Sequence, residues 1–123
     1  MGAILNLVER NLHEVRVDDA RMLFHIPSSS LFASDALTGE IIDSLRAAGC
    51  SSEALVQRLA ERFDGAEVNE VLRELIALEL VSDGSPLTPD IATRRVERTA
   101  LNTVVLNVNT GCNLSCTYCY KED

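Results

Sequence analysis

The stretch Arg21-Met-Leu-Phe-His-Ile-Pro-Ser-Ser-Ser-Leu-Phe-Ala-Ser-Asp-Ala-Leu37 decides the fold, because the spacing of its apolar residues changes within it. Met22, Phe24 and Ile26 alternate with the residues between them, which is typical of a strand. A proline and three serines then favour a turn, and a very short strand is expected at Leu31–Ala33. Beyond it, apolar residues recur every three or four positions, as in an amphipathic helix. The stretch therefore predicts strands followed by helices.

On the N-terminal side, Leu12–Val17 is predicted to be another strand, joined to Arg21–Ile26 by a hairpin turn at Asp18-Asp19. The three short strands would form a small antiparallel meander. His13 and His25 lie in these strands. Neither histidine has a recognisable partner in the sequence, so neither is assigned a catalytic role.

On the C-terminal side, three amphipathic helices are predicted, and Gly49 is expected to end the first of them. The candidate N-caps are Ser34 or Asp35, Ser51 or Ser52, and Asp64, which with Glu67 resembles a capping box. The apolar stripes are Leu37, Ile41, Ile42 and Leu45, then Leu55, Val56, Leu59 and Phe63, and finally Val68, Val71, Leu72, Leu75 and Ile76.

Three short strands and three helices within residues 1–84 predict a winged helix-turn-helix of the α+β class. Residues 85–101 contain two prolines and the run Arg94-Arg95-Val-Glu-Arg98, and they predict a linker. Thr103–Val108 is a continuous apolar run, typical of a strand buried on both faces of a parallel sheet. Its partner strands are expected beyond residue 123, so residues 102–123 would begin a second domain.

The net charge of −8 belongs to the first domain, which holds seven arginines against fifteen acidic residues. The third helix alone is predicted to carry Glu67, Glu70, Glu74 and Glu79 against the single Arg73. A phosphate backbone would repel that helix, so a nucleic acid is not the expected partner. The acidic surface is interpreted either as a solvated face or as a site for a basic peptide.

No apolar run approaches the roughly 20 residues that span a bilayer, and the N-terminal residues lack a secretory signal pattern. No membrane partner is therefore expected. A reducing, cytoplasmic location follows as the expectation.

Cys112, Cys116 and Cys119 place three thiols within eight residues, directly after the apolar run. Disulfides are disfavoured by the odd number and the reducing location. A structural zinc site normally has four ligands, and Cys50 would have to reach the loop from the helical domain. Cys50 is instead expected to act as a small buried hydrophobe. A Cys-x-x-Cys redox pair would leave the third thiol without a role, whereas three thiolates suit a [4Fe-4S] cluster with one open iron.

The C-x3-C-x2-C spacing, with Tyr118 just before the third cysteine, resembles the cluster loop of radical S-adenosylmethionine enzymes. The resemblance covers about twenty residues. It implies that Cys112, Cys116 and Cys119 bind a [4Fe-4S] cluster whose open iron chelates S-adenosyl-L-methionine, and that Tyr118 lies near the adenine. It also implies an external electron donor and the formation of a 5′-deoxyadenosyl radical that abstracts hydrogen from the substrate. The cluster loop would belong to a partial (β/α)6 barrel.

The first domain, followed by such a loop, resembles the PqqD-like recognition element of enzymes that modify ribosomally made peptides. In that family the leader of a precursor peptide adds as a strand beside the third strand and packs on the third helix. The resemblance implies a peptide-binding groove, half of whose apolar members could equally be plain core. Its residues would be Leu31, Phe32, Ala33, Val71, Arg73, Leu75 and Leu78.

Together the two parts resemble the SPASM or twitch peptide maturases, and the cysteine loop most resembles those that mature quinohemoprotein amine dehydrogenase. This implies thioether cross-links between a Cys sulfur and a methylene carbon of Asp or Glu. Alternatives are other thioether bonds of the sactipeptide or ranthipeptide type, C–C bonds, or a leader-binding module alone. A winged-helix regulator with a cysteine metal sensor is a further alternative. The family's later barrel segments and auxiliary iron–sulfur clusters would lie beyond residue 123, so no catalytic residue is expected within this chain. Alone it is expected to be inactive and to hold at best a labile cluster.

Overall fold

The computed structural model describes residues 2–90, 103–106, 108, 111–112, 114 and 116–118. The chain divides into two compact units, one up to Pro89 and the other from Asp90 to Asp123. Each unit is described by itself below.

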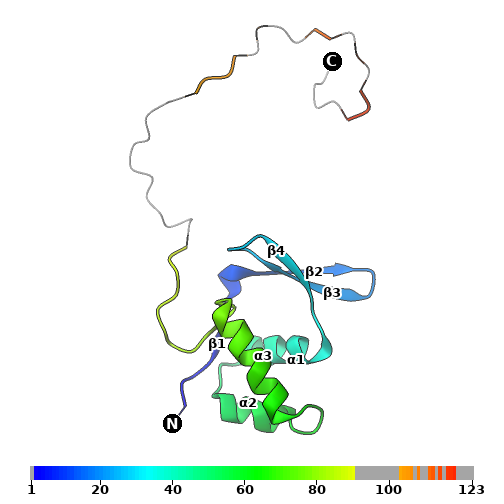
Figure 1. Ribbon diagram of the computed structural model, residues 1–123. Helices are drawn as coiled ribbons and strands as arrows, with labels where there is room; N and C mark the ends of the chain where they lie inside the picture. Colours follow the sequence, from blue (N-terminus) through cyan, green and yellow to red (C-terminus); the bar gives the residue numbers. More distant parts are fainter. Residues whose placement is uncertain are drawn as a thin grey trace. The chain divides into compact units, whose positions relative to one another are not determined.

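The first unit contains a three-stranded antiparallel sheet and three helices, which confirms the predicted α+β class. The helices lie on one side of the sheet (Figure 1). The strands, in their order across the sheet, are β2 (Leu12–Val17), β3 (Ala20–His25) and β4 (Ser30–Ala33), and the helices are α1 (Ala36–Ala47), α2 (Ser52–Leu59) and α3 (Gly65–Ala77).

The helix starts follow two of the three predicted caps. The Asp35 carboxylate accepts a hydrogen bond from the Thr38 backbone N–H at 2.7 Å, and Ser51 Oγ accepts one from the Ala54 N–H at 3.2 Å. Asp64 occupies the N-cap position of α3 with extended backbone, but its side chain makes no capping hydrogen bond. The predicted capping box at this helix is therefore wrong, and α3 is held by its buried stripe instead.

Gly49 follows α1 for a different reason from the one predicted. The helix ends at Ala47 because Ala48 is already extended, and Gly49 does not adopt a positive φ. A Cβ at Gly49 would lie 2.9 Å from the Leu5 carbonyl oxygen, so the glycine permits the N-terminal segment to approach closely. That segment contains β1 (Asn6–Leu7), which pairs antiparallel with β5 (Val81–Ser82); neither strand was predicted.

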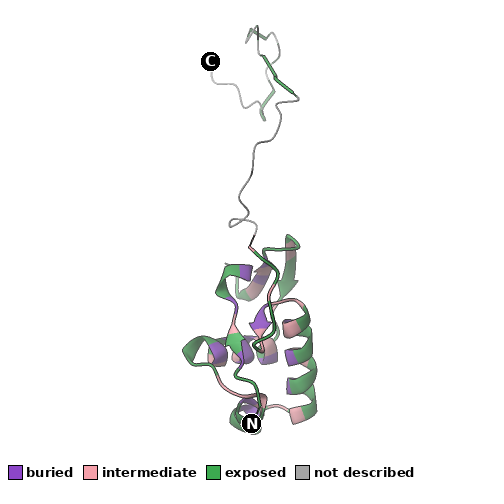
Figure 2. Cartoon of the chain, turned by 90° about the vertical axis from the view of Figure 1, so that its left-hand side faces the viewer, coloured by how far each residue is buried: buried purple, intermediate pink, exposed green. Residues whose placement is uncertain are grey.

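The core lies between the sheet and the helices. Figure 2 shows buried residues on the inward surfaces of the elements and exposed residues outside. Leu23 and His25 are the β3 residues that face the helices, at 3% and 5% exposure. The alternating set of Met22, Phe24 and Ile26 therefore lies on the outer face of the sheet. The predicted helical stripes supply most of the core, although Val56, Phe63, Val71 and Ile76 are only partly buried.

The predicted linker begins inside the first unit. The Thr88 N–H and hydroxyl donate to the Glu79 carboxylate at 2.9 and 3.0 Å, and Arg10 donates to the Thr88 carbonyl at 2.7 Å. These bonds hold the chain up to Pro89 against the domain. Residues 91–102, which contain the three arginines of the basic run, lie outside the described residues.

In the second unit, the predicted strand Thr103–Val108 is not formed in its described residues. Residues 103–106 have no regular secondary structure, and Val105 and Leu106 are about four-fifths exposed. A strand obtains its backbone hydrogen bonds from a neighbouring strand, and the described residues of this unit include none.

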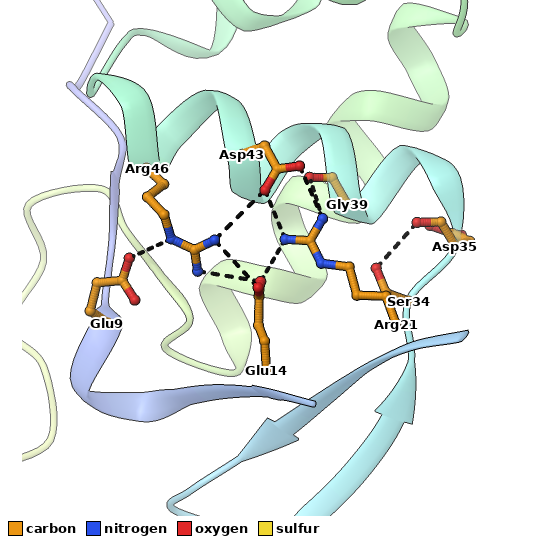
Figure 3. Close-up of polar contacts among 8 residues, drawn as sticks. All are labelled: Glu9, Glu14, Arg21, Ser34, Asp35, Gly39, Asp43 and Arg46. Carbon is orange, nitrogen blue, oxygen red and sulfur yellow. Dashed lines mark hydrogen bonds and ion pairs between the residues drawn. The ribbon is translucent and has the colours of Figure 1, made fainter. Parts of the chain in front are cut away.

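An arginine network joins the sheet to α1 (Figure 3). Arg21 on β3 bridges Glu14 on β2, at 2.6 Å, and Asp43 on α1, at 2.8 Å. Arg46, one turn further along α1, pairs with Glu9 at 2.8 Å and with Glu14 at 3.3 Å. These pairs connect α1 to β2, to β3 and to the 3-10 turn Glu9–Asn11 that precedes β2.

The network makes stability depend on acid pH. Burial raises the pKa of Glu14, but hydrogen bonds from Arg21 and Arg46 outweigh it, so the net shift is downward. The Arg21 hydrogen bonds likewise lower the pKa of Asp43, against its partial burial. A carboxylate with a lowered pKa in the folded state stabilises the fold above its unfolded pKa. We expect about 1 kcal/mol to be lost as pH falls from about 5 through the lowered folded pKa values, after allowing for the exposure of Asp43.

Urea unfolding at several pH values measures this loss. Arg21→Gln should reduce the stability above pH 5 and flatten its decline in acid. Arg58→Gln removes an exposed arginine outside the network and should leave the decline unchanged. An equally steep decline in Arg21→Gln would show that other carboxylates cause it.

Candidate functional site

The outer edge of β4 is an open hydrogen-bonding edge. The Ser34 N–H donates to the Arg21 carbonyl on β3, so the alternation of an antiparallel strand turns the N–H and C=O groups of Leu31 and Ala33 away from the sheet. Residues 30–33 carry no charged side chain, and Leu31 and Phe32 are 56% and 41% exposed. Charged residues and prolines are the usual protection of an edge strand, and β4 has neither.

The opposite edge of the sheet is better protected. There β2 exposes the backbone groups of Glu14 and Arg16, whose charged side chains discourage the addition of another strand. If an extended peptide adds to this sheet, it is therefore expected to pair with β4 and not with β2.

A hollow of about 390 Å³ lies between the start of α1 and the outer side of α3. It begins at Asp35, two residues beyond the end of β4. Its apolar lining is Leu37, Phe63 and Val71, and the acidic residues are Asp35, Glu67, Glu70 and Glu74.

The glutamates of this hollow differ in pairing from the four carboxylates that form ion pairs with arginines, Glu9, Glu14, Glu40 and Asp43. Glu67, Glu70 and Glu74 are exposed, and within the described part of the chain none is ion-paired with an arginine. The arginine network engages Arg21 and Arg46 elsewhere, and Arg62 pairs with Glu40. Among the described residues, the hollow thus combines three glutamates that have no ion-pair partner with an apolar centre, and the Arg62 guanidinium lies 5.3 Å from the centre of the Phe63 ring.

The structure brings together only part of the predicted peptide-binding set. Leu31, Phe32 and Ala33 are exposed on β4, and Val71 lines the hollow. The side chain of Phe32 lies on the sheet face that is turned toward the helices, because its partner in β3 is the buried Leu23. The side chains of Leu31 and Ala33 lie on the opposite, outer face of the sheet, because their partners in β3 are Phe24 and Met22, so these two residues contribute the open backbone edge.

The other three predicted residues lie elsewhere. Leu75 is 5% exposed and belongs to the core. Arg73 lines a separate hollow with Leu5 and Asn69, on another side of α3. Leu78 is half-buried against the core at the end of the helix.

The C-terminal end of α3 is held by two buried polar residues, Asn11 and His25, for which the sequence indicated no partner. His25 Nε2 lies 2.7 Å from the Leu78 carbonyl oxygen, and its Nδ1 lies 2.6 Å from Ser28 Oγ. Asn11 Nδ2 donates to the Glu79 carbonyl at 2.9 Å. The interpretation of His25 as a residue without a partner is corrected, because its side chain joins β3 to the C-terminal end of α3.

The cysteine loop is described only in part. Cys112 and Cys116 are free, exposed thiols, and Cys119 lies outside the described residues. The Leu114 N–H donates to Cys112 Sγ at 3.4 Å, a bond of the kind that stabilises a thiolate ligand. Tyr118 is exposed. No metal-binding group of three His, Cys, Asp or Glu side chains occurs among the described residues, which omit the third cysteine.

Comparison with known proteins gives no relative: no protein-family model, no curated protein and no solved structure matches the chain. In the described part of the chain, none of the helices combines the length and apolar character that a membrane span requires.

Proposed function

We propose that the chain is the N-terminal part of a radical S-adenosylmethionine peptide maturase, and that its first unit is a winged helix-turn-helix that binds the leader of a precursor peptide. The leader adds as a strand to the β4 edge, and its side chains reach the hollow beside α3. The observation that carries this proposal is the open, uncharged edge at Leu31 and Ala33 next to an apolar hollow.

The cysteine loop supports the enzyme class. Cys112, Cys116 and Cys119 would hold a [4Fe-4S] cluster, with S-adenosyl-L-methionine at its open iron and Tyr118 near the adenine. Two of the thiols are exposed and free, and a backbone N–H is directed at one of them, which fits thiolate ligation. When bound, the cluster and S-adenosylmethionine supply the radical chemistry, and an external donor supplies the electron.

The substrate in this proposal is the precursor of the quinohemoprotein amine dehydrogenase small subunit, in which Cys sulfur atoms become joined to methylene carbons of Asp or Glu. Other thioether or C–C bonds in a modified peptide are the alternative. In either case the first unit captures the peptide and the cysteine loop belongs to the unit that modifies it, in the cytoplasm.

A proline variant of the β4 edge tests leader binding. Ala33→Pro removes an N–H that points to the open edge, and it leaves the bonds between β3 and β4 in place. Fluorescence anisotropy with the labelled small-subunit precursor should give micromolar binding to the unmodified protein. Ala33→Pro should weaken it by about tenfold, because the loss of one strand hydrogen bond and the steric block together would cost about 1.4 kcal/mol.

Arg16→Pro is the matched control, since it places a proline at an outward-facing N–H of the opposite edge, on β2. Circular dichroism checks that both variants fold. The proposed site would be overturned if Ala33→Pro bound the peptide as tightly as the unmodified protein does. It would also be overturned if Ala33→Pro and Arg16→Pro lost the same amount of affinity.

A further inference from the structure

We propose that the peptide bound at the β4 edge is cationic, and that the unpaired glutamates of the neighbouring hollow select lysine or arginine side chains close to an apolar one. This inference rests on the proposed function, because it assigns the chemistry of the peptide that the first unit binds. It adds a substrate preference that the open strand edge alone does not provide.

The charge argument concerns Glu67, Glu70 and Glu74. These residues lie at intervals of three and four along α3, so they project from the same side of the helix. Like charges at this spacing repel one another by a few tenths of a kcal/mol per pair. No described arginine relieves that repulsion, whereas Glu9, Glu14, Glu40 and Asp43 all have arginine partners. A cationic ligand would supply the missing counter-charge.

The apolar centre of the hollow indicates that the bound peptide also carries an apolar side chain. Leu37, Phe63 and Val71 line it, and the last two pack only partly against the core. Phe32, on the adjacent strand, presents a 41% exposed ring on the same face of the sheet as the core residues. A peptide that enters along β4 can therefore bury an apolar side chain here while long basic side chains reach the glutamates at the rim.

The geometry also favours a peptide over a nucleic acid or an isolated cation. The acidic rim repels phosphate, which excludes a nucleic acid from this face. The carboxylates of Glu67, Glu70 and Glu74 are exposed to solvent. An extended peptide can form hydrogen bonds with the β4 edge and ion pairs with the glutamates, whereas a free cation can interact only with the glutamates.

Three synthetic peptides of equal length test the preference. They share the same leucines and valines, and their remaining positions are all lysine, all glutamine or all glutamate. Each is titrated into the isotopically labelled full chain at low salt, and amide chemical shifts of Leu31, Ala33, Val71 and Glu74 report binding at the site. We expect the lysine peptide to bind about three- to tenfold more tightly than the glutamine peptide, and the glutamate peptide most weakly. Added salt should reduce the difference.

Two double variants locate the effect. Glu70→Gln with Glu74→Gln should remove most of the advantage of the lysine peptide. Glu53→Gln with Asp83→Asn removes one exposed and one half-exposed charge, neither of which lines this hollow, and it should keep the advantage.

The outcomes separate the charge preference from the leader site itself. Equal affinity for the three peptides, or an advantage that survives in Glu70→Gln with Glu74→Gln, overturns the preference and leaves strand addition standing. If Ala33→Pro still binds the lysine peptide as the unmodified protein does, strand addition at β4 is overturned while the glutamate site remains. Failure of all three peptides to shift the four amides overturns both.

Discussion

Replacement of Cys116 by alanine is expected to remove most of the iron that the chain takes up when it is reconstituted anaerobically with iron and sulfide. Each thiolate contributes one negative charge and one bond to a cluster iron, so a three-cysteine site that loses one ligand exposes a second iron to solvent. Iron and acid-labile sulfide, measured per chain after gel filtration, check the expectation. The visible absorbance of the reconstituted protein should fall in parallel.

Cys50→Ala is the matched control for this experiment. Cys50 is partly buried against the core, and its backbone pairs with Leu5 through hydrogen bonds of 2.8 and 3.2 Å. It is a packing residue of the first unit, as the sequence led us to expect, and its removal should leave iron uptake unchanged. Full iron uptake by Cys116→Ala, or a loss as large in Cys50→Ala, would contradict the assignment of the cysteine loop as the cluster site.

The sequence predicted the regular elements of the first unit well, because each long element has a strong period. The alternation through Arg21–Ile26 and the helical stripes place the strands and helices close to their observed bounds. The pairing of β1 with β5 was missed because each strand has two residues, too few for a period to be recognised. The role of Gly49 was misread because a close approach by a distant segment leaves no local sequence signal.

The sequence indicated which segments of the chain form the candidate site, but not which of their side chains share one surface. The short strand expected at residues 31–33 is present and its lack of charge was visible in the sequence, while peptide binding there stays a prediction. On α3, the apolar residues recur every three or four positions, and this spacing does not show which side of the apolar face is turned toward α1 and the end of β4. Val71 lies on that side, whereas Leu75 is buried and Arg73 lies at another hollow. Only the packing of α3 against α1 distinguishes them.

The contact of His25 with α3 was beyond sequence reasoning for a similar reason. Its partner Leu78 is 53 residues away, and a histidine in a strand gives no indication of a carbonyl that approaches from a helix end. The relevant local structure is a left-handed turn at Glu79, with a φ of 54°. The N–H groups of Glu79 and Leu80 donate back to the carbonyls of Ile76 and Leu75, which closes the helix without a glycine.

His25→Ala is expected to lower the free energy of unfolding by about 2–4 kcal/mol. The substitution removes the donor to the Leu78 carbonyl, and an unsatisfied buried acceptor costs about 1–3 kcal/mol. The loss of the buried ring adds a packing cost. Because a domain of this size is commonly stable by only about 5–15 kcal/mol, urea denaturation should show a large shift of the midpoint.

Two comparisons separate the hydrogen bond from the ring. His25→Phe keeps an aromatic ring but has no donor, so it should retain part of the loss, about 1–3 kcal/mol. His13→Ala removes the exposed histidine of β2 and should change the stability by less than about 0.5 kcal/mol. If His25→Phe were as stable as the unmodified protein, the Leu78 contact would be dispensable. The end of α3 would then be positioned by its apolar packing and by the hydrogen bond from the Asn11 amide to the Glu79 carbonyl.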